Sequence, residues 1–301
     1  MAFINEALDF LRDSKHIADK PPDGGASRLA LWRAYMRLKA KRLRNHDRGN
    51  VTLLGYRMRY FDAANFAQLF REIFVNRFYY VPLAAETPKI IDCGSNIGMS
   101  ILFFKNIYPR AKIVGFEPNP LTFPTLCENV ERNALSDVAL YQRALSDRPG
   151  TIEFFVKANE PGALNVGMFA GRGETPITVQ ADQLSSYIDG AVDLLKLDIE
   201  GAEELVLTDL ARQDKLRYIK NIVCEYHHHH RRDGGRDRLS QTLGILEEAG
   251  FSYQLDAYCG PSVRHFSYQD VLIYANRKGS SAVPRQGTSQ HLGAEAPSKR
   301  L

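Results

Sequence analysis

The chain of 301 residues lacks the features that would place it in a membrane or around a structural metal ion. No apolar run approaches the ~18 residues that a membrane-spanning helix needs. The first 20 residues mix acidic and basic side chains into their apolar positions, which is not the pattern of a signal or transit peptide. The four cysteines stand far apart, at positions 93, 127, 224 and 259, without the spacing of metal ligands. The sequence therefore predicts a cytoplasmic protein with reduced, buried cysteines and no metal site.

The glycine-rich turn at residues 92–98 also lacks the G-x-G-x-x-G spacing that seats a dinucleotide. It reads Asp-Cys-Gly-Ser-Asn-Ile-Gly, with no basic residue to meet a phosphate. The apolar residues before it predict a strand, and the amphipathic stretch after it predicts a helix. Gly94 and Gly98 allow a sharp turn and the close approach of a ligand to the amides that begin the helix. We expect Asp92, Gly94, Asn96 and Gly98 to form a binding site; the alternative is a turn that is purely structural.

The end of the next predicted strand carries an acidic residue. Residues 112–117 read Lys-Ile-Val-Gly-Phe-Glu, a buried strand that ends in Glu117 roughly 20 residues after the glycines. A carboxylate at this distance commonly accepts the hydroxyls of a ribose. Together the two strand ends resemble the S-adenosylmethionine site of a class I methyltransferase. We then expect Ala144, Leu145 and Ser146, which end the following predicted strand, to contact the adenine.

Charged residues gather at a further strand end. The segment that begins at Val192 is apolar until Lys196, Asp198 and Glu200 appear at alternating positions. This spacing puts three side chains on one face at the carboxyl end of a strand, where open α/β sheets bind ligands. His227 follows the next predicted strand and titrates near neutral pH. Asp198, Glu200 and His227 are the candidate proton acceptors, with Asp198 first; alternatively, Asp198 orients Lys196 or the amino group of the ligand.

Alternating strands and helices predict a mostly parallel sheet with helices on both faces, in a catalytic domain at residues 85–277. Residues 1–84 predict a helical extension with a small hairpin, and residues 278–301 a disordered tail. The basic helix expected at residues 27–46 forms a packed cap with a solvated face, or alternatively contacts anionic lipid or nucleic acid. Glu72, in an aromatic helix of this extension, is expected either at the helix surface or facing the site.

Taken together, these motifs resemble those of the FkbM family of S-adenosylmethionine-dependent methyltransferases. The resemblance rests on the turn at residues 92–98, on Gly-Phe-Glu-Pro-Asn at 115–119 and on Ala-Leu-Ser-Asp at 144–147. Above all it rests on Leu-Lys-Leu-Asp-Ile-Glu-Gly-Ala-Glu at residues 195–203. It covers roughly residues 51–276.

The resemblance implies a Rossmann-like, seven-stranded sheet whose last strand is antiparallel. It also implies S-adenosyl-L-methionine as the cofactor and in-line methyl transfer to a hydroxyl of a sugar or natural product. The partner is then a small-molecule or glycan acceptor, with no nucleic acid and with peripheral membrane contact through the basic helix as an option. The loop at residues 161–173 departs from the serine-rich form of the family, which leaves the acceptor open.

Two other functions stay open at this point. An RNA or protein methyltransferase would use the basic helix to guide an anionic polymer. A noncatalytic scaffold would bind the cofactor and form no product. A nicotinamide-dependent dehydrogenase is disfavoured, because the dinucleotide fingerprint is missing.

Overall fold

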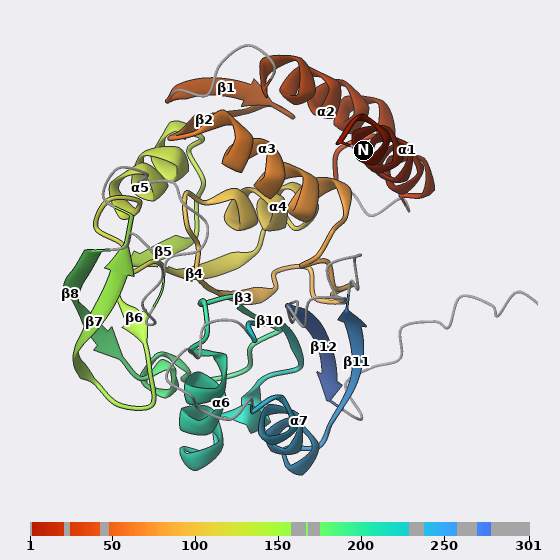
Figure 1. The fold of residues 1–301 in the computed structure, drawn as a ribbon. Coiled ribbons are helices and arrows are strands. Elements are labelled where there is room, and N and C mark those ends of the chain that lie inside the picture. The colour runs from red at the N-terminus through yellow and green to blue at the C-terminus, as the bar shows by residue number, and fades with distance from the viewer. Residues whose placement is uncertain are drawn as a thin grey trace, which may run out of the picture.

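A central seven-stranded sheet runs through the molecule (Figure 1). The computed structural model describes residues 2–20, 25–42, 48–157, 167, 175–228, 238–257 and 270–277. The strands of this sheet are β3 Lys89–Cys93, β4 Lys112–Phe116, β5 Val138–Tyr141, β9 Leu194–Leu197, β10 Asn221–Tyr226, β11 Phe251–Ala257 and β12 Val271–Arg277. Their order is β11-β12-β10-β9-β3-β4-β5, and every pair is parallel except the two that β12 makes. The predicted sheet, with its last strand antiparallel, is confirmed.

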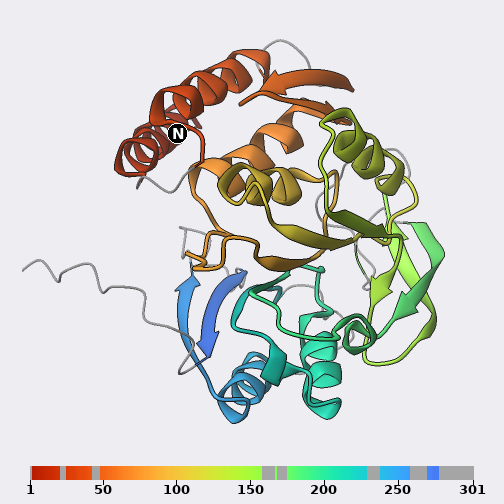
Figure 2. The same ribbon diagram turned by 180° about the vertical axis from the view of Figure 1, so that it is seen from behind.

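Helices cover both faces of this sheet, as predicted (Figures 1 and 2). On one face lie α3 Ala63–Phe70, α4 Met99–Ile107 and α5 Phe123–Arg132, and on the other lie α6 Glu203–Arg212 and α7 Leu239–Glu248. Successive residues of β3 serve the two faces, because Ile90 belongs to the hydrophobic core beside α4 and Ile91 to the core beside α6. Both are 0% exposed. The sheet is therefore buried on both sides, which explains its nearly continuous apolar strands.

The N-terminal extension shares the first of these cores. It consists of α1 Ala2–Asp19, α2 Arg28–Arg42 and a hairpin of β1 Gly49–Leu53 and β2 Tyr56–Tyr60. One face of α2 is buried at the spacing of a packed helix, through Leu31, Ala34, Tyr35 and Leu38. Its arginines at positions 28, 33 and 37 are exposed, as expected of a cap with a solvated face. Membrane contact and the domain division at residue 84 stay predictions. Among the described helices, no segment has the length and apolar character needed to cross a membrane.

Two predicted elements differ from the observed ones. The helix expected at residues 65–79 ends as α3 at Phe70 and continues as a π-helical turn, Arg71–Val75, in which the N–H of Asn76 donates to the carbonyl of Arg71 at 2.7 Å. The strand expected at residues 138–145 divides, because the chain turns after β5, where the N–H of Arg143 donates to the carbonyl of Tyr141.

The second half of that strand belongs to a separate three-stranded sheet. This sheet joins β6 Ala144–Leu145, β7 Gly150–Val156 and β8 Thr175–Asp182 in the order β6-β8-β7. β7 and β8 pair in antiparallel orientation. Most of the loop at residues 161–173 lies outside the described residues, as do residues 229–237 and the predicted tail.

Candidate active site

The glycine turn after β3 is held close to two neighbouring strands. The N–H groups of Gly94 and Ser95 both donate to the carbonyl of Phe116, the last residue of β4. Gly94 has φ +82, and a Cβ atom there would stand 1.8 Å from the carbonyl oxygen of Asp198. Gly98, at φ +91, immediately precedes α4. The turn therefore presents bare backbone at the carboxyl ends of β3, β4 and β9, as the sequence suggested.

The buried side chain of Asp92 stabilises this turn through hydrogen bonds. Its side chain is 0% exposed, and Oδ2 accepts hydrogen bonds from the hydroxyls of Ser95 at 2.9 Å and Ser100 at 2.6 Å. Its Oδ1 lies 3.2 Å from the Nζ of Lys196. Asp92 thus ties the turn to α4 and β9, and its predicted contact with the ammonium group of a cofactor stays a prediction.

Glu117 lies directly beside the turn. Its Oε2 accepts the backbone N–H of Asn96 at 2.9 Å, and its Oε1 accepts the N–H of Asn119 at 2.9 Å and the hydroxyl of Thr122 at 3.1 Å. The residue is only 6% exposed, and burial raises its pKa to about 7 against the lowering effect of these hydrogen bonds. The structure therefore brings Gly94, Asn96 and Glu117 together at one strand edge.

Lys196 is the buried cation of the site. Its Nζ lies 3.2 Å from Asp92 Oδ1 and 3.4 Å from Asp198 Oδ2, and it donates to the carbonyls of Cys93 at 3.1 Å and Gly94 at 2.6 Å. Burial lowers its pKa, but the two carboxylates more than offset this effect, and the net shift is upward. Lys196 therefore stays charged and links the glycine turn to β9.

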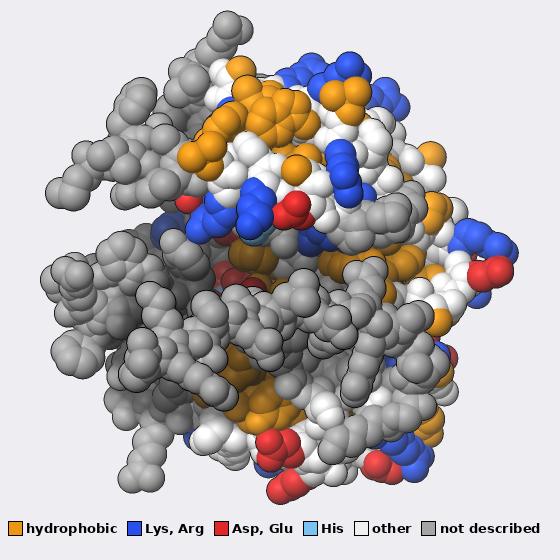
Figure 3. All heavy atoms as spheres, turned by 90° about the vertical axis from the view of Figure 1, so that its right-hand side faces the viewer, with side chains coloured by type: hydrophobic (Ala, Val, Ile, Leu, Met, Phe, Trp, Pro, Cys, Tyr) orange, Lys and Arg blue, Asp and Glu red, His pale blue; other side chains and the backbone are white. Residues whose placement is uncertain are grey.

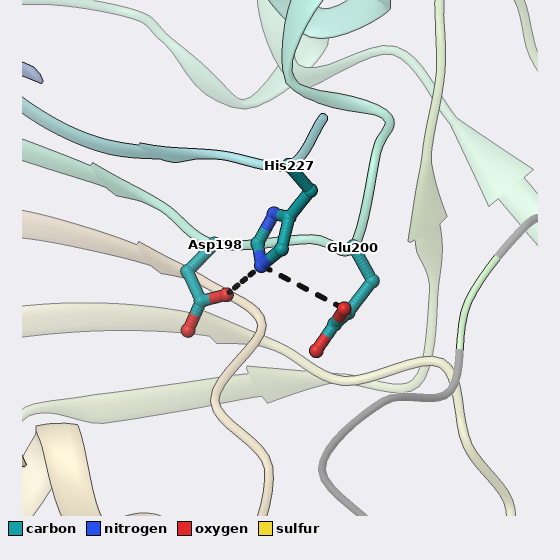
Figure 4. A group of neighbouring side chains, drawn as sticks. All are labelled: Asp198, Glu200 and His227. Carbon is teal, nitrogen blue, oxygen red and sulfur yellow. Dashed lines mark ion pairs between the residues drawn. The ribbon is translucent and has the colours of Figure 1, made fainter. Parts of the chain in front are cut away.

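Asp198, Glu200 and His227 converge on one point (Figure 4). The Nε2 of His227 lies 3.6 Å from Asp198 Oδ1 and 3.6 Å from Glu200 Oε2. The Nδ1 of the same ring lies 2.9 Å from Glu203 Oε1, which also accepts the N–H groups of Ile199 and Gly201. Because a carboxylate only accepts, Nδ1 carries the proton of this bond and Nε2 faces the other two carboxylates. The predicted convergence of these three strand-end residues is observed.

The charges around this point shift several pKa values. Burial lowers the pKa of His227, but Glu203, Glu200 and Asp198 raise it by more, so the net shift is well upward. For Asp198, burial raises the pKa, while Lys196, His227 and the hydroxyl of Tyr79, which donates to Oδ2 at 2.7 Å, lower it overall. Asp198 is thus held as an anion between two cationic groups.

Three more carboxylates, Glu225, Asp270 and Glu72, interact electrostatically with this group, and the sequence analysis had considered only Glu72. Burial, with Asp198 and Glu72 adding to it, raises the pKa of Glu225 to about 8. Burial also raises the pKa of Glu72 to about 6, with Asp198 and Asp270 contributing. Glu72 Oε1 accepts a hydrogen bond from Gln68 Nε2 at 3.0 Å, and the two predicted placements of Glu72 stay predictions. Figure 3 shows acidic side chains in a recess near the centre of this side of the molecule.

The predicted adenine contacts lie in the small sheet. Ala144 and Leu145 form β6, which pairs with β8, and Ser146 follows with its N–H donating to the carbonyl of Asp182. All three are buried, and Leu145 shares a hydrophobic core with Phe116. They adjoin the end of β4, and their contact with adenine stays a prediction.

Gly167 lies against the acidic cluster. It is buried, and a Cβ atom there would lie 2.8 Å from the Cβ and 2.9 Å from the carbonyl oxygen of Glu200. We expect Gly167→Ala to displace Glu200 and lower turnover at this site by about tenfold or more, while binding of a ligand at the glycine turn changes less than threefold, roughly. Calorimetry and label transfer measure the two effects. Gly190→Ala, where the new Cβ meets nothing within 4 Å, is the control; an equal loss in both variants would contradict the expectation.

The strand order, the glycine turn and the acidic strand ends define the class I methyltransferase fold. The chain belongs to the FkbM methyltransferase family, since the family model for the methyltransferase FkbM domain matches residues 92–253, more than half of the sequence.

Several known proteins that are similar to this chain are named as methyltransferases. Methyltransferase sdnD of Sordaria araneosa is 30% identical over 62% of this chain and 83% of its own length. The 31-O-demethyl-FK506 methyltransferase FkbM of Streptomyces tacrolimicus is 28% identical over 61% of this chain and 81% of its own length. The hexuronic acid methyltransferase AglP of Haloferax volcanii is 30% identical over 57% of this chain and 66% of its own length.

Proposed function

We propose that this methyltransferase uses S-adenosylmethionine to methylate a hydroxyl of a sugar or natural product. The names of two relatives support the acceptor class, since one acts on an O-demethyl natural product and another on a hexuronic acid. The observation that carries the cofactor assignment is Glu117, a buried carboxylate held against the bare backbone of the glycine turn by the N–H of Asn96.

These residues fit the cofactor chemically. A carboxylate can accept both hydroxyls of a ribose, and Oε2 of Glu117, with a single hydrogen bond from Asn96, has acceptor capacity left. The turn from Gly94 to Gly98 lets the amino-acid part approach the backbone and the amides at the start of α4. Ala144, Leu145 and Ser146 would pack near the adenine.

Asp198, Glu200 and His227 would contact the molecule that accepts the methyl group. When bound, the cofactor supplies a methyl group that its sulfonium already activates, so the protein contributes mainly by holding the acceptor oxygen in line. The new carbon–oxygen bond forms as the carbon–sulfur bond breaks, and the hydroxyl proton leaves to a nearby base. Asp198 orients the hydroxyl and takes this proton, because its carboxylate lies where the three side chains converge.

The experiment combines labelled cofactor with a variant of Glu117. Wild-type protein incubated with cell extract should place label in the small-molecule or glycan fraction. Glu117→Ala should weaken cofactor binding by about 10- to 100-fold in calorimetry, since two hydrogen bonds to a charged group are lost. The titration is run at pH 8, roughly a unit above the raised pKa of Glu117, so that the carboxylate is ionised.

Glu131→Ala serves as the matched control, because Glu131 is an exposed carboxylate on α5, the helix that follows Glu117 in the chain. Thermal unfolding of both variants separates loss of binding from loss of fold. Unchanged affinity in Glu117→Ala would remove the ribose assignment. Label in RNA or protein alone, or in no fraction at all, would overturn the acceptor class.

A further inference from the structure

Carboxylates are concentrated at the active-site edge of the sheet. Five separate elements bring carboxylates here: the π-helical turn, the segment after β9, the start of α6, the end of β10 and the residue before β12. These carboxylates are Glu72, Asp198, Glu200, Glu203, Glu225 and Asp270. Lys196 and His227 form ion pairs with members of this group. So many carboxylates around one imidazole make this edge a candidate site for a further cation.

Three of these side chains have the donor set and spacing of a metal site. The ligand atoms of Asp198, Glu200 and His227 all lie within 4.8 Å of one another. At 3.6 Å, the Nε2 of His227 is too far from either carboxylate oxygen for a hydrogen bond. Two ligands that each stand about 2.1 Å from one ion are roughly 3.0 to 3.5 Å apart, so small side-chain rotations would complete the site.

The other ring nitrogen is fixed as metal sites require. Glu203 is 1% exposed and holds Nδ1 of His227 at 2.9 Å, which sets the orientation of the ring and directs Nε2 at Asp198 and Glu200. A carboxylate on the far nitrogen of a metal-binding histidine is the usual supporting arrangement.

A second observation comes from Asp270. Its Oδ1 is buried and accepts no hydrogen bond from any described residue. The carboxylates of Asp270 and Glu225 form a second group with His227, again with all ligand atoms within 4.8 Å. A buried carboxylate oxygen without a donor is costly unless a cation stands near it. The two groups share His227, so Asp270 and Glu225 lie beside the first group.

We propose that Asp198 Oδ1, Glu200 Oε2 and His227 Nε2 bind one divalent cation, with Asp270 and Glu225 supplying further negative charge or holding its water. The oxygen-rich set with one imidazole suits Mn²⁺ or Mg²⁺ better than the soft, thiolate-seeking metals. The sequence had predicted no metal site, because Asp198, Glu200 and His227 were interpreted as proton acceptors and not as ligands.

This metal site rests on the proposed function, and it explains how the acceptor hydroxyl, a poor nucleophile, could be activated. With an ion bound, Asp198 acts as a ligand in place of the base. The ion would polarise the acceptor hydroxyl and ease loss of its proton, which passes through the other carboxylates to solvent. Six-coordinate ions leave about three positions beyond the three protein ligands. Two neighbouring oxygens of a sugar can fill two of them, which favours an acceptor with adjacent hydroxyl or carboxyl groups.

The test uses Mn²⁺ alone on chelator-treated full-length protein, with electron paramagnetic resonance to separate free from bound ion. Wild type should bind one Mn²⁺ per chain, and Glu200→Gln should bind it at least about tenfold more weakly. Glu153→Gln, an exposed carboxylate of β7, is the control and should match wild type. Thermal unfolding verifies that Glu200→Gln folds. Asp270→Asn, which keeps the shape of its side chain, should also weaken binding.

The outcomes separate this proposal from the proposed function. Chelator treatment should abolish label transfer and leave cofactor binding in calorimetry unchanged, and added Mn²⁺ or Mg²⁺ should restore transfer. Absence of Mn²⁺ binding, equal binding by wild type and Glu200→Gln, or release of Mn²⁺ when cofactor is added would overturn the metal site. Transfer that persists in chelator would do the same and leave the methyltransferase proposal intact. Loss of cofactor binding with Mn²⁺ binding retained would overturn only the cofactor assignment.

Discussion

Replacing Lys196 by methionine should lower the free energy of unfolding by about 3 to 5 kcal/mol, because it leaves buried carboxylates without their cation. Lys196 is 1% exposed, and its Nζ lies between Asp92 at 3.2 Å and Asp198 at 3.4 Å. Methionine fills much of the volume but offers no donor for the carbonyls of Cys93 and Gly94. Urea unfolding followed by circular dichroism measures the loss. Cofactor binding should fall as well, since Gly94 loses its anchor.

Two further variants show that charge, not packing, is the cause. Lys220→Met removes a lysine that is 47% exposed and pairs with Asp193, and it should cost no more than about 1 kcal/mol. Asp92→Asn combined with Lys196→Met should recover part of the stability, because it removes one unpaired charge. The raised pKa of Lys196 places loss of its charge above the ordinary range near 10.4, so the effect should be constant from about pH 6 to pH 9. Equal losses at Lys196 and Lys220 would contradict this account.

The site residues at the ends of the parallel strands could be predicted from the sequence, because a single rule of sheet geometry locates them. Parallel strands end at the same edge of a sheet, so an acidic residue after an apolar run marks that edge. This rule found Glu117 and Asp198, and the histidine after β10 followed from the same reasoning. It also applies to Glu225, near the end of β10, which the sequence analysis passed over.

The place of Asp270 in the site could not be predicted from its neighbouring sequence, because it depends on the direction of a strand in the sheet. Asp270 precedes β12, and only because this strand is antiparallel does its start lie at the edge where the parallel strands end. Tyr226 pairs with Val271, which sets Asp270 beside His227. The ends of short strands could not be predicted from the neighbouring sequence either. The break between β5 and β6 depends on pairing with β8, about 35 residues further along the chain.

The N-terminal extension contributes to the site through contacts between distant residues. Tyr79, which follows the π-helical turn, donates to Asp198 at 2.7 Å and to Glu225 at 3.3 Å. The same turn holds Glu72, and a widened helical turn of this kind often occurs at functional sites. The aromatic helix pattern predicted the element and its buried face. It could not predict that the helix would widen and bring Glu72 into electrostatic interaction with Asp198 and Asp270.

Gly94→Ala should be strongly damaging, because it combines an unfavourable backbone conformation with a collision against backbone. The residue has φ +82, and the added Cβ would stand 1.8 Å from the carbonyl oxygen of Asp198, an atom that no side-chain rotation can move. The glycine turn would have to separate from β9. We expect a loss of about 3 kcal/mol or more in the free energy of unfolding. Cofactor affinity should fall by at least about 100-fold, roughly 2.7 kcal/mol.

Gly55→Ala provides a matched control for this prediction. Gly55 has a similar backbone, at φ +88, but nothing lies within 4 Å of an added Cβ. It therefore reports the cost of the left-handed conformation alone, about 1 to 2 kcal/mol, with cofactor affinity unchanged. The difference between the two variants in urea unfolding isolates the collision between the turn and Asp198. If Gly94→Ala lost no more stability than Gly55→Ala and still bound cofactor, the turn would not be held against β9, and the shared edge of β3, β4 and β9 could not form the cofactor site.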